Sequence, residues 1–215
     1  MRRLRRLAVA TWLAASAMAA AAAESDPERA PPTHLPAGGS VALAFSPWQD
    51  PEALLLQAIA DARELILVQA YLFTSKPLAR GLIAAHQRGV RVEVLLDAEM
   101  NRPASPSVLP QLLAAGIPVA VETRFNIAHN KLMIFDPASR TRGAVATGSY
   151  NFTRSARTIN AENLLLLRGN PALVAAYADN WKRHRADALV LRSLDDLPGR
   201  KGKMDGRESD RGTPD

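Results

Sequence analysis

Short apolar runs alternate with amphipathic stretches from residue 41 to residue 194. Apolar runs of about four to eight residues that end in turn residues are typical of buried strands, whereas helices repeat apolar positions every three to four residues. The runs predict strands at Val41–Phe45, Glu64–Ala70, Val90–Leu96, Ile117–Val121, Lys131–Asp136, Gly143–Thr147 and Asn163–Arg168. The repeats predict helices at Pro51–Ala62, Pro77–Arg88, Ser107–Ala115 and Pro171–Arg185. This alternation predicts an α/β fold, a layered domain with a central, mostly parallel β-sheet flanked by helices.

The two ends of the chain lack this alternation. Residues 1–23 join an arginine-rich start to an alanine-rich apolar run, which predicts a cleaved signal peptide and secretion across the inner membrane to the periplasm. Residues 24–40 are rich in proline and small residues and predict a linker. Residues 195–215 are charged and almost free of apolar residues, so we expect a disordered tail. Residues 41–194 remain as the expected folded domain.

The charge balance changes when the predicted signal peptide is removed. The whole chain has 27 basic and 21 acidic residues and a formal net charge of +6. Residues 1–23 hold four arginines and no acidic residue, so the remainder carries 23 basic against 21 acidic residues. The basic character of the full chain is therefore weak support for a nucleic-acid partner. The chain has no cysteine, which excludes disulfides, thiolate metal sites and a cysteine nucleophile.

One polar pattern interrupts the apolar strands. His129, Lys131 and Asp136 follow the spacing H-x-K-x₄-D, and a G-S-x-N sequence runs from Gly148 to Asn151. Residues two apart in a strand point to the same face, so His129 and Lys131 are expected side by side. A potential nucleophile beside a fixed positive charge suits chemistry on a phosphodiester. Burying such a set of polar groups without a function would cost free energy.

These residues resemble the HKD signature of the phospholipase D superfamily. The resemblance continues downstream through Gly148–Thr153 and Ala161–Asn163, and upstream in Ala70–Ser75 and Arg88–Val94. Together these segments are similar to the single-motif, Nuc-type bacterial endonucleases over residues 41 to 185. The resemblance implies a phospholipase D-like fold and a covalent phosphohistidine intermediate.

Phosphodiester cleavage needs a nucleophile and groups that neutralise charge on the phosphoryl oxygens. We expect His129 to attack phosphorus through a neutral ring nitrogen. Lys131 supplies the fixed positive charge, and Ser149 and Asn151 donate hydrogen bonds to the same oxygens.

Two carboxylates complete the expected catalytic set. Glu162, by its position in Nuc-type sequences, is expected to accept a hydrogen bond from the second ring nitrogen of His129 and to fix its tautomer. Asp136 lies at the far end of the strand, where it is expected to hold Lys131 or the backbone in place.

The motif also predicts a homodimer. One histidine cannot easily attack phosphorus and protonate the leaving oxygen from opposite sides. His86, Arg88 and Glu93 repeat the motif spacing, but this run crosses a helix end and no G-S-x-N sequence follows it. A two-fold dimer would bring two copies of His129 together and complete the active site.

Further side chains near the motif are candidates for substrate contacts. Three arginines are placed to contact phosphates without reading sequence: Arg124, Arg154 and Arg157. Four aromatic residues have faces that bases stack on, although core packing is the commoner role beside strands: Tyr71, Phe125, Tyr150 and Phe152. We found no cofactor motif and no metal-ligand cluster in the sequence, and the expected chemistry needs neither.

Three functions are compatible with this pattern. The first is a metal-independent, non-specific endonuclease that cleaves DNA, with RNA as a further substrate. The second is a phospholipase D-type hydrolase of phospholipid headgroups, because the motif recognises only the diester. The third is an inactive nucleic-acid-binding module, which would predict the loss of His129, Lys131 or Asn151. All three residues are present, which counts against the inactive module. The resemblance to Nuc-type sequences, the small size and the single motif favour the endonuclease over the phospholipid hydrolase.

Overall fold

The computed structural model describes residues 32–102 and 106–199. The chain divides into two units, Met1–His34 and Leu35–Asp215, and the described helices and strands belong to the second. The predicted signal peptide, most of the linker and residues 200–215 of the predicted tail lie outside the described residues. Within the described ranges, no helix has the length and apolar character needed to cross a membrane.

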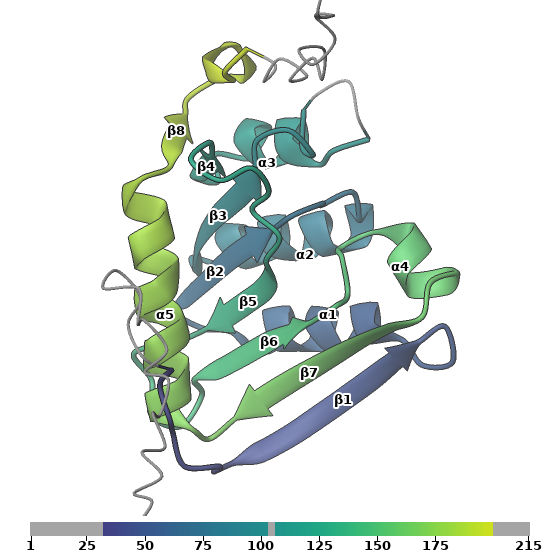
Figure 1. Ribbon diagram of the computed structural model, residues 1–215, viewed down its shortest axis with the longest axis vertical. Coiled ribbons are helices and arrows are strands. Elements are labelled where there is room, and N and C mark those ends of the chain that lie inside the picture. The colour runs from purple at the N-terminus through teal and green to yellow at the C-terminus, as the bar shows by residue number, and fades with distance from the viewer. Residues whose placement is uncertain (1–31, 103–105, 200–215) are drawn as a thin grey trace, which may run out of the picture. The chain divides into compact units, whose positions relative to one another are not determined.

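An eight-stranded sheet forms the centre of the second unit, with the order β1-β7-β6-β5-β2-β3-β4-β8 (Figure 1). The strands are β1 (Ser40–Ser46), β2 (Leu65–Ala70), β3 (Arg91–Asp97), β4 (Val119–Glu122), β5 (Lys131–Phe135), β6 (Ala144–Gly148), β7 (Glu162–Arg168) and β8 (Leu189–Leu191). The predicted α/β layered fold is confirmed.

The sheet is mixed, and the expectation of a mostly parallel sheet is wrong. Only β2–β3 and β3–β4 pair in parallel, whereas the other five neighbouring pairs are antiparallel. Parallel neighbours need a crossover of a dozen or so residues, usually a helix, and α2 (Lys76–Gln87) and α3 (Leu109–Ala114) provide these crossovers. Short connections without a long helix join β5, β6 and β7, so these strands pair antiparallel.

Helices cover the two faces of the sheet unequally. The larger core cluster lies between the sheet and α1 (Pro51–Asp61), α2 and α3, with fully buried Leu55, Leu82 and Leu109. On the other face α5 (Pro171–Ala186) packs against β2, β4, β5 and β6 through Val174 and Trp181. In Figure 1, α5 crosses in front of the sheet and α1 to α3 lie behind it.

Side-chain caps fix where the helices begin. Asp50, Ser75 and Asn170 accept hydrogen bonds from backbone N–H groups in the first turns of α1, α2 and α5. Each of these helices also has a proline in its first turn, where the missing N–H leaves no bond unmade.

Three short elements were not predicted: α4 (Arg154–Thr158), β8 and the 3₁₀ turn η1 (Leu194–Asp196). Regular structure extends past residue 194, where the disordered tail was expected to begin. Ser193 and Asp196 form a capping box, and Leu197 packs against the larger core cluster, which explains the ordered extension.

One end of the sheet collects the polar motif. The strand directions place the carboxyl ends of β1, β2, β3, β4 and β6 beside the amino ends of β5 and β7. We call this end the loop rim. Residue 129 lies in the β4–β5 connection, residue 149 lies in the β6–β7 connection, and residue 162 begins β7, so all three lie on the loop rim.

Candidate active site

His129 and Lys131 meet at the ring of Tyr71. The His129 ring is exposed and lies edge-on to Tyr71, with 4.4 Å between the ring centroids. Nζ of Lys131 lies 5.0 Å from the Tyr71 ring centroid and donates a 2.8 Å hydrogen bond to the His129 carbonyl oxygen. The predicted pair is therefore brought together, with Tyr71 as its shared support.

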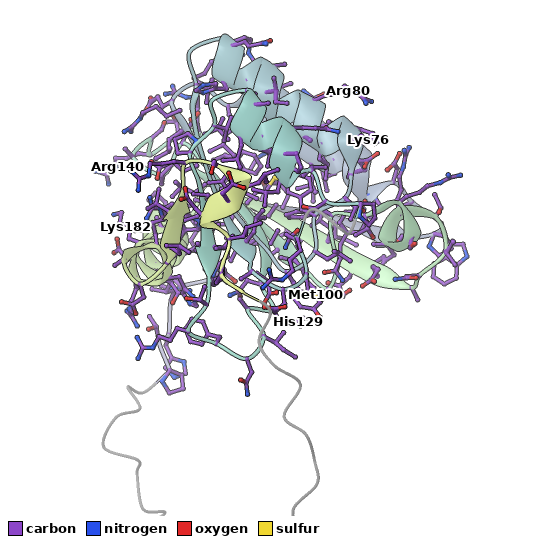
Figure 2. The ribbon with its side chains drawn as sticks, turned by 90° about the horizontal axis from the view of Figure 1, so that it is seen from above. Lys76, Arg80, Met100, His129, Arg140 and Lys182 are labelled. Atoms are coloured by element: carbon purple, nitrogen blue, oxygen red, sulfur yellow. The ribbon has the colours of Figure 1, made fainter. Side chains whose placement is uncertain are left out.

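A buried network fixes the segment that carries His129. Asp97, at the end of β3, accepts hydrogen bonds from the backbone N–H groups of Ala128 and Met100, each at 2.9 Å. Asn101 is fully buried and donates to the Tyr71 carbonyl oxygen at 2.8 Å. Figure 2 shows His129 beside Met100, as this network requires. Asp97 and Asn101 thus position both rings, a role that the sequence alone did not reveal.

The charge of Lys131 sits in a poorly hydrated place. The residue is only 7% exposed, and this burial lowers the pKa of its ammonium group, while the negative charge of Glu162 acts in the opposite direction. A cation with few waters around it interacts more strongly with an anion that approaches it. Lys131 is therefore placed to neutralise a phosphoryl group.

Glu162 is tied to Ser149, and the prediction that it orients His129 is not met in the described chain. Its carboxylate accepts hydrogen bonds from Ser149 Oγ at 2.6 Å and from Asn160 Nδ2 at 3.1 Å. Strand β6 lies between β7 and β5, so about 10 Å separates the backbone of Glu162 from that of the HKD strand. Glu162 reaches the site through its charge on Lys131.

Gly148 and Ser149 hold the start of the G-S-x-N segment against β7. A Cβ atom on Gly148 would lie 2.3 Å from the Asn163 carbonyl oxygen, so only glycine fits there. The Ser149 N–H donates to that carbonyl oxygen at 3.1 Å, and Ser149 Oγ accepts from the Asn163 N–H at 3.0 Å. The Ser149 hydroxyl hydrogen is used on Glu162, so Ser149 holds the carboxylate in place.

Asn151 lies half-buried on the same segment. Its Oδ1 atom is buried and finds no hydrogen-bond donor among residues 32–102 and 106–199. The next residue, Phe152, is anchored through its carbonyl oxygen by the N–H groups of Thr74 and Ser75, each at 2.9 Å. The backbone next to Asn151 is therefore fixed. Its side-chain amide oxygen can accept a hydrogen bond from a donor outside the described chain.

Asp136 lies away from the site. It follows the far end of β5, and a strand of this length puts it about 16 Å from Lys131. Its buried carboxylate accepts from the backbone N–H groups of Arg63, Glu64 and Leu65. Burial would raise its pKa, but these hydrogen bonds and one from Arg142 hold the pKa below its ordinary value. The expectation that Asp136 holds the backbone in place agrees with this geometry, whereas a place in the catalytic set does not.

The three candidate arginines have different surroundings. Arg124 pairs with Asp187 at 2.5 Å, and Arg157 pairs with Asp50 at 2.6 Å and Glu52 at 2.9 Å. These two guanidinium groups are occupied inside the protein. Arg154 is exposed and has no ion-pair partner within the described ranges, so of the three it remains the most open to a phosphate.

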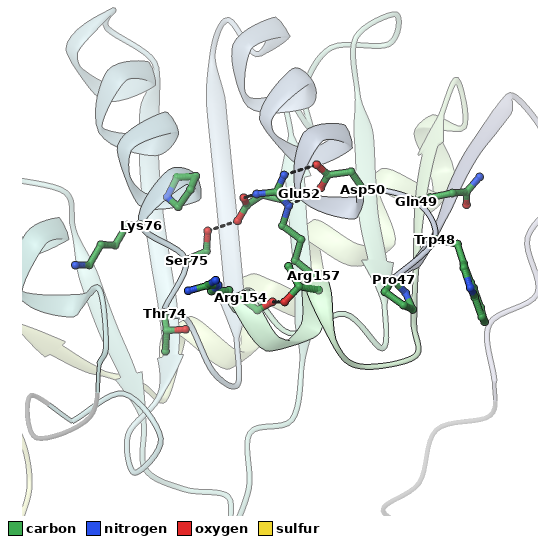
Figure 3. Close-up of a pocket in the computed structure, with 12 residues that line it drawn as sticks. Pro47, Trp48, Gln49, Asp50, Glu52, Thr74, Ser75, Lys76, Arg154 and Arg157 are labelled. Carbon is green, nitrogen blue, oxygen red and sulfur yellow. Dashed lines mark hydrogen bonds and ion pairs between the residues drawn. The ribbon is translucent and has the colours of Figure 1, made fainter.

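A groove opens on the loop rim next to this segment, with a volume of about 1010 Å³. Figure 3 shows side chains from the β1–α1 connection, the start of α2 and α4 around it. Among them are Trp48 and Lys76, which the sequence analysis did not select. Tyr150 and Phe152, in contrast, are buried in the core. Across the described residues, no cluster of three or more histidine and acidic side chains is arranged to hold a metal ion.

Comparison with known proteins agrees with this site. A family model described as "Cardiolipin synthase, PLD-like domain" matches residues 55–185. A phospholipase D of Rickettsia typhi is 36% identical over 151 residues, which are 70% of this chain and 71% of that protein. A mitochondrial cardiolipin hydrolase of Xenopus tropicalis is 33% identical over 130 residues, 60% of this chain and 58% of that protein.

Comparison with solved structures identifies the same family. The crystal structure of Nuc, a phospholipase D family member from Salmonella typhimurium, matches with a TM-score of 0.67 and 31% identity. The match covers 73% of this chain and 100% of Nuc. The family match includes the complete HKD pattern and the G-S-x-N segment, and the chain therefore belongs to the phospholipase D superfamily of phosphodiesterases.

Proposed function

We propose that this protein is a metal-independent endonuclease that cleaves DNA, and RNA as a further substrate, without sequence preference. The observation that carries the proposal is the exposed His129 ring beside the buried cation of Lys131, with both held on Tyr71. This arrangement suits attack on an anionic diester. The likeness to Nuc over that protein's full length supports nucleic acid as the substrate class.

In the proposed mechanism His129 forms a covalent bond to phosphorus. A neutral ring nitrogen attacks the diester, the P–O bond to the leaving nucleotide breaks, and a second histidine gives the leaving oxygen a proton. Water then attacks the phosphohistidine, the P–N bond breaks, and the second histidine takes the proton from that water. Lys131 stabilises the negative charge on the phosphoryl oxygens in both steps.

The second histidine is proposed to be His129 of another copy of the chain. The chain holds one HKD pattern, and a two-fold homodimer supplies the second without new sequence. An apolar surface supports self-association, because Val41, Leu43 and Phe45 of edge strand β1 each expose about half of their surface. We call these three residues the β1 stripe. It runs toward the loop rim that carries His129.

A phospholipid hydrolase is the second candidate. Two of the compared relatives are named phospholipase D and mitochondrial cardiolipin hydrolase. Phe125 and Ile127, in the connection that leads to His129, are 40% and 59% exposed, and exposed apolar side chains at a site favour contact with lipid.

We also propose that the protein is exported to the periplasm, whichever substrate it cleaves. The arginine-rich and apolar amino-terminal pattern supports this proposal.

The deciding experiment compares substrates in excess EDTA. Wild-type protein and His129→Ala are incubated with plasmid DNA, with RNA, and with vesicles of phosphatidylcholine and cardiolipin. We expect wild type to degrade the plasmid and His129→Ala to leave it intact. Release of lipid headgroups with intact plasmid would replace the endonuclease by the second candidate. If folded wild-type protein cleaves none of them, an inactive binding module becomes the better description.

A further inference from the structure

The groove on the loop rim is built from three separate connections. Trp48 lies on the β1–α1 connection, Lys76 begins α2, and Arg154 begins α4. Figure 3 shows Trp48 and Lys76 at opposite ends of the groove, with Arg154 and Arg157 between them. Its volume of about 1010 Å³ is at the upper end of the range for small-ligand sites, so it has room for more than one nucleotide.

A tight turn presents Trp48 to solvent. Gln49 N–H donates to the Phe45 carbonyl oxygen at 2.7 Å, and Phe45 N–H donates to Gln49 Oε1 at 2.8 Å. These two bonds close the turn on both sides of Trp48, whose side chain is 83% exposed. The backbone of this turn is therefore fixed, and a tryptophan side chain has only two rotatable bonds to order when a flat group stacks on it.

The cations of the groove are not all neutralised. Arg157 pairs with both groove carboxylates, Asp50 and Glu52, and the Ser75 hydroxyl also donates to Glu52. Lys76 and Arg154 are exposed and pair with no carboxylate in the part of the chain that the structure describes. The groove therefore offers two open positive charges and one open aromatic face.

The groove lies next to the G-S-x-N segment and the start of β7. Its wall at Thr74 and Ser75 is hydrogen-bonded to Phe152, the residue after Asn151. At the other end, Ser46 is the register partner of Glu162, and Trp48 follows two residues later. The groove therefore adjoins the side of the site that Asn151 and Glu162 form.

We propose that this groove binds single-stranded nucleic acid on one side of the cleaved phosphodiester, with a base stacked on Trp48 and phosphates at Lys76 and Arg154. This inference rests on the proposed endonuclease function. An aromatic face stacks on any unpaired base, whereas bases in a duplex are already covered on both faces. The groove therefore favours single strands and reads no sequence.

Binding in a cleavage-deficient background tests the stacking contact. In the full chain carrying His129→Asn, fluorescence anisotropy measures the affinity for a labelled single strand of about 20 nucleotides, which is longer than a typical single-strand binding site, and for the matching duplex. Trp48→Ala should raise the Kd for the single strand about tenfold, and for the duplex less than about twofold. Trp48→Phe keeps an aromatic face and should recover most of the affinity. Val190→Ala removes part of an exposed apolar side chain from β8 and serves as the matched control.

Cleavage assays separate this inference from the proposed function. In the otherwise wild-type chain, the ratio of kcat/KM for the single strand to kcat/KM for bis(p-nitrophenyl) phosphate should fall about tenfold in Trp48→Ala. If wild type cleaves the small diester and no nucleic acid, the endonuclease proposal fails. If wild type cleaves nucleic acid and Trp48→Ala changes neither the Kd nor this ratio, only the groove assignment is overturned.

Discussion

At the scale of single residues, Lys131 keeps its charge where folding disfavours it. Burial lowers the pKa of its ammonium group and outweighs the attraction of Glu162. A lysine whose pKa is lower in the folded than in the unfolded chain destabilises the fold fully below the folded pKa. This penalty decreases as pH rises from the folded pKa to the unfolded pKa, because the folded lysine loses its proton first.

Replacing this lysine should therefore separate stability from activity. We expect Lys131→Met to abolish phosphodiester cleavage and to raise the free energy of unfolding by about 1 kcal/mol at pH 7, since methionine fills the space without a charge. The gain should shrink at alkaline pH, as the sign of the pKa shift requires. Urea unfolding across this pH range measures it.

The control for this change is Lys182→Met. Lys182 is an exposed lysine that pairs with Asp179 on α5, so its replacement should leave cleavage intact and alter stability by less than about 0.5 kcal/mol. A Lys131→Met variant that is less stable than wild type at pH 7 would mean that the bond to the His129 carbonyl oxygen outweighs the cost of burial.

Only some of the contacts in the site could be predicted from the sequence. Spacing alone placed His129 and Lys131 together, because the two-residue period of a strand is a local property. Asp136 belongs to the same motif but acts at the other end of β5, and Glu162 bonds to Ser149 in place of His129. Those partners depend on strand order. The supporting roles of Asp97 and Asn101 depend on tertiary contacts, which the spacing of the motif does not encode.

At the scale of elements, a buried polar cluster fastens α5 to the sheet. Glu122 of β4 is buried, accepts a 3.0 Å hydrogen bond from Gln69 Nε2 and lies 2.5 Å from His184 Nδ1. Trp181 Nε1 adds a 3.0 Å bond to the Val68 carbonyl oxygen. The residues around His184 in the sequence do not reveal this contact, because its partner is 62 residues away along the chain.

Removing the histidine should loosen this attachment. We expect His184→Ala to lower the free energy of unfolding by about 3 kcal/mol, because it leaves the buried Glu122 carboxyl group with only Gln69 as a partner. Adding Glu122→Gln to that variant should restore part of the loss, since a neutral amide is cheaper to bury. Urea unfolding of both variants, with His86→Ala on α2 as control, gives the answer. Equal losses in His184→Ala and His86→Ala would refute a stabilising role for the Glu122 contact.

The element scale also explains what the sequence predicted of the fold. The four predicted helices and seven predicted strands are present within a few residues of their expected bounds, because their apolar patterns and the caps of α1, α2 and α5 are local properties of the sequence. The mixed pairing was missed because it is set by which strands become neighbours. Strand β8 has three residues, too few to show a period.

At the scale of the whole molecule, the two edges of the sheet are different surfaces. Edge strand β1 carries the β1 stripe, and edge strand β8 exposes Leu189 and Val190. Exposed strand edges invite pairing or packing with another chain unless something covers them. The longer β1 stripe approaches the loop rim, so we propose that the homodimer packs through the sheet face that carries this stripe and leaves β8 free.

Leu43→Lys tests that assignment, with Val190→Lys as its matched control. Leu43 is 50% exposed and Val190 is 47% exposed, so a lysine on either edge strand should leave the fold intact. A charge placed inside a subunit contact should weaken the dimer by about tenfold or more. We therefore expect Leu43→Lys to sediment as a monomer and to lose nuclease activity, whereas Val190→Lys remains an active dimer.

The sedimentation and activity results test the dimeric mechanism and the choice of the β1 stripe as its interface separately. If wild type sediments as a monomer and its specific activity does not fall on dilution, one histidine is enough and the dimeric mechanism is refuted. If both variants stay dimeric and active, the dimer forms through a surface other than the β1 stripe. If Leu43→Lys loses both association and cleavage, the β1 stripe is part of the dimer interface on which catalysis at His129 depends. The reason is that only the assembled dimer brings a second histidine to the phosphodiester.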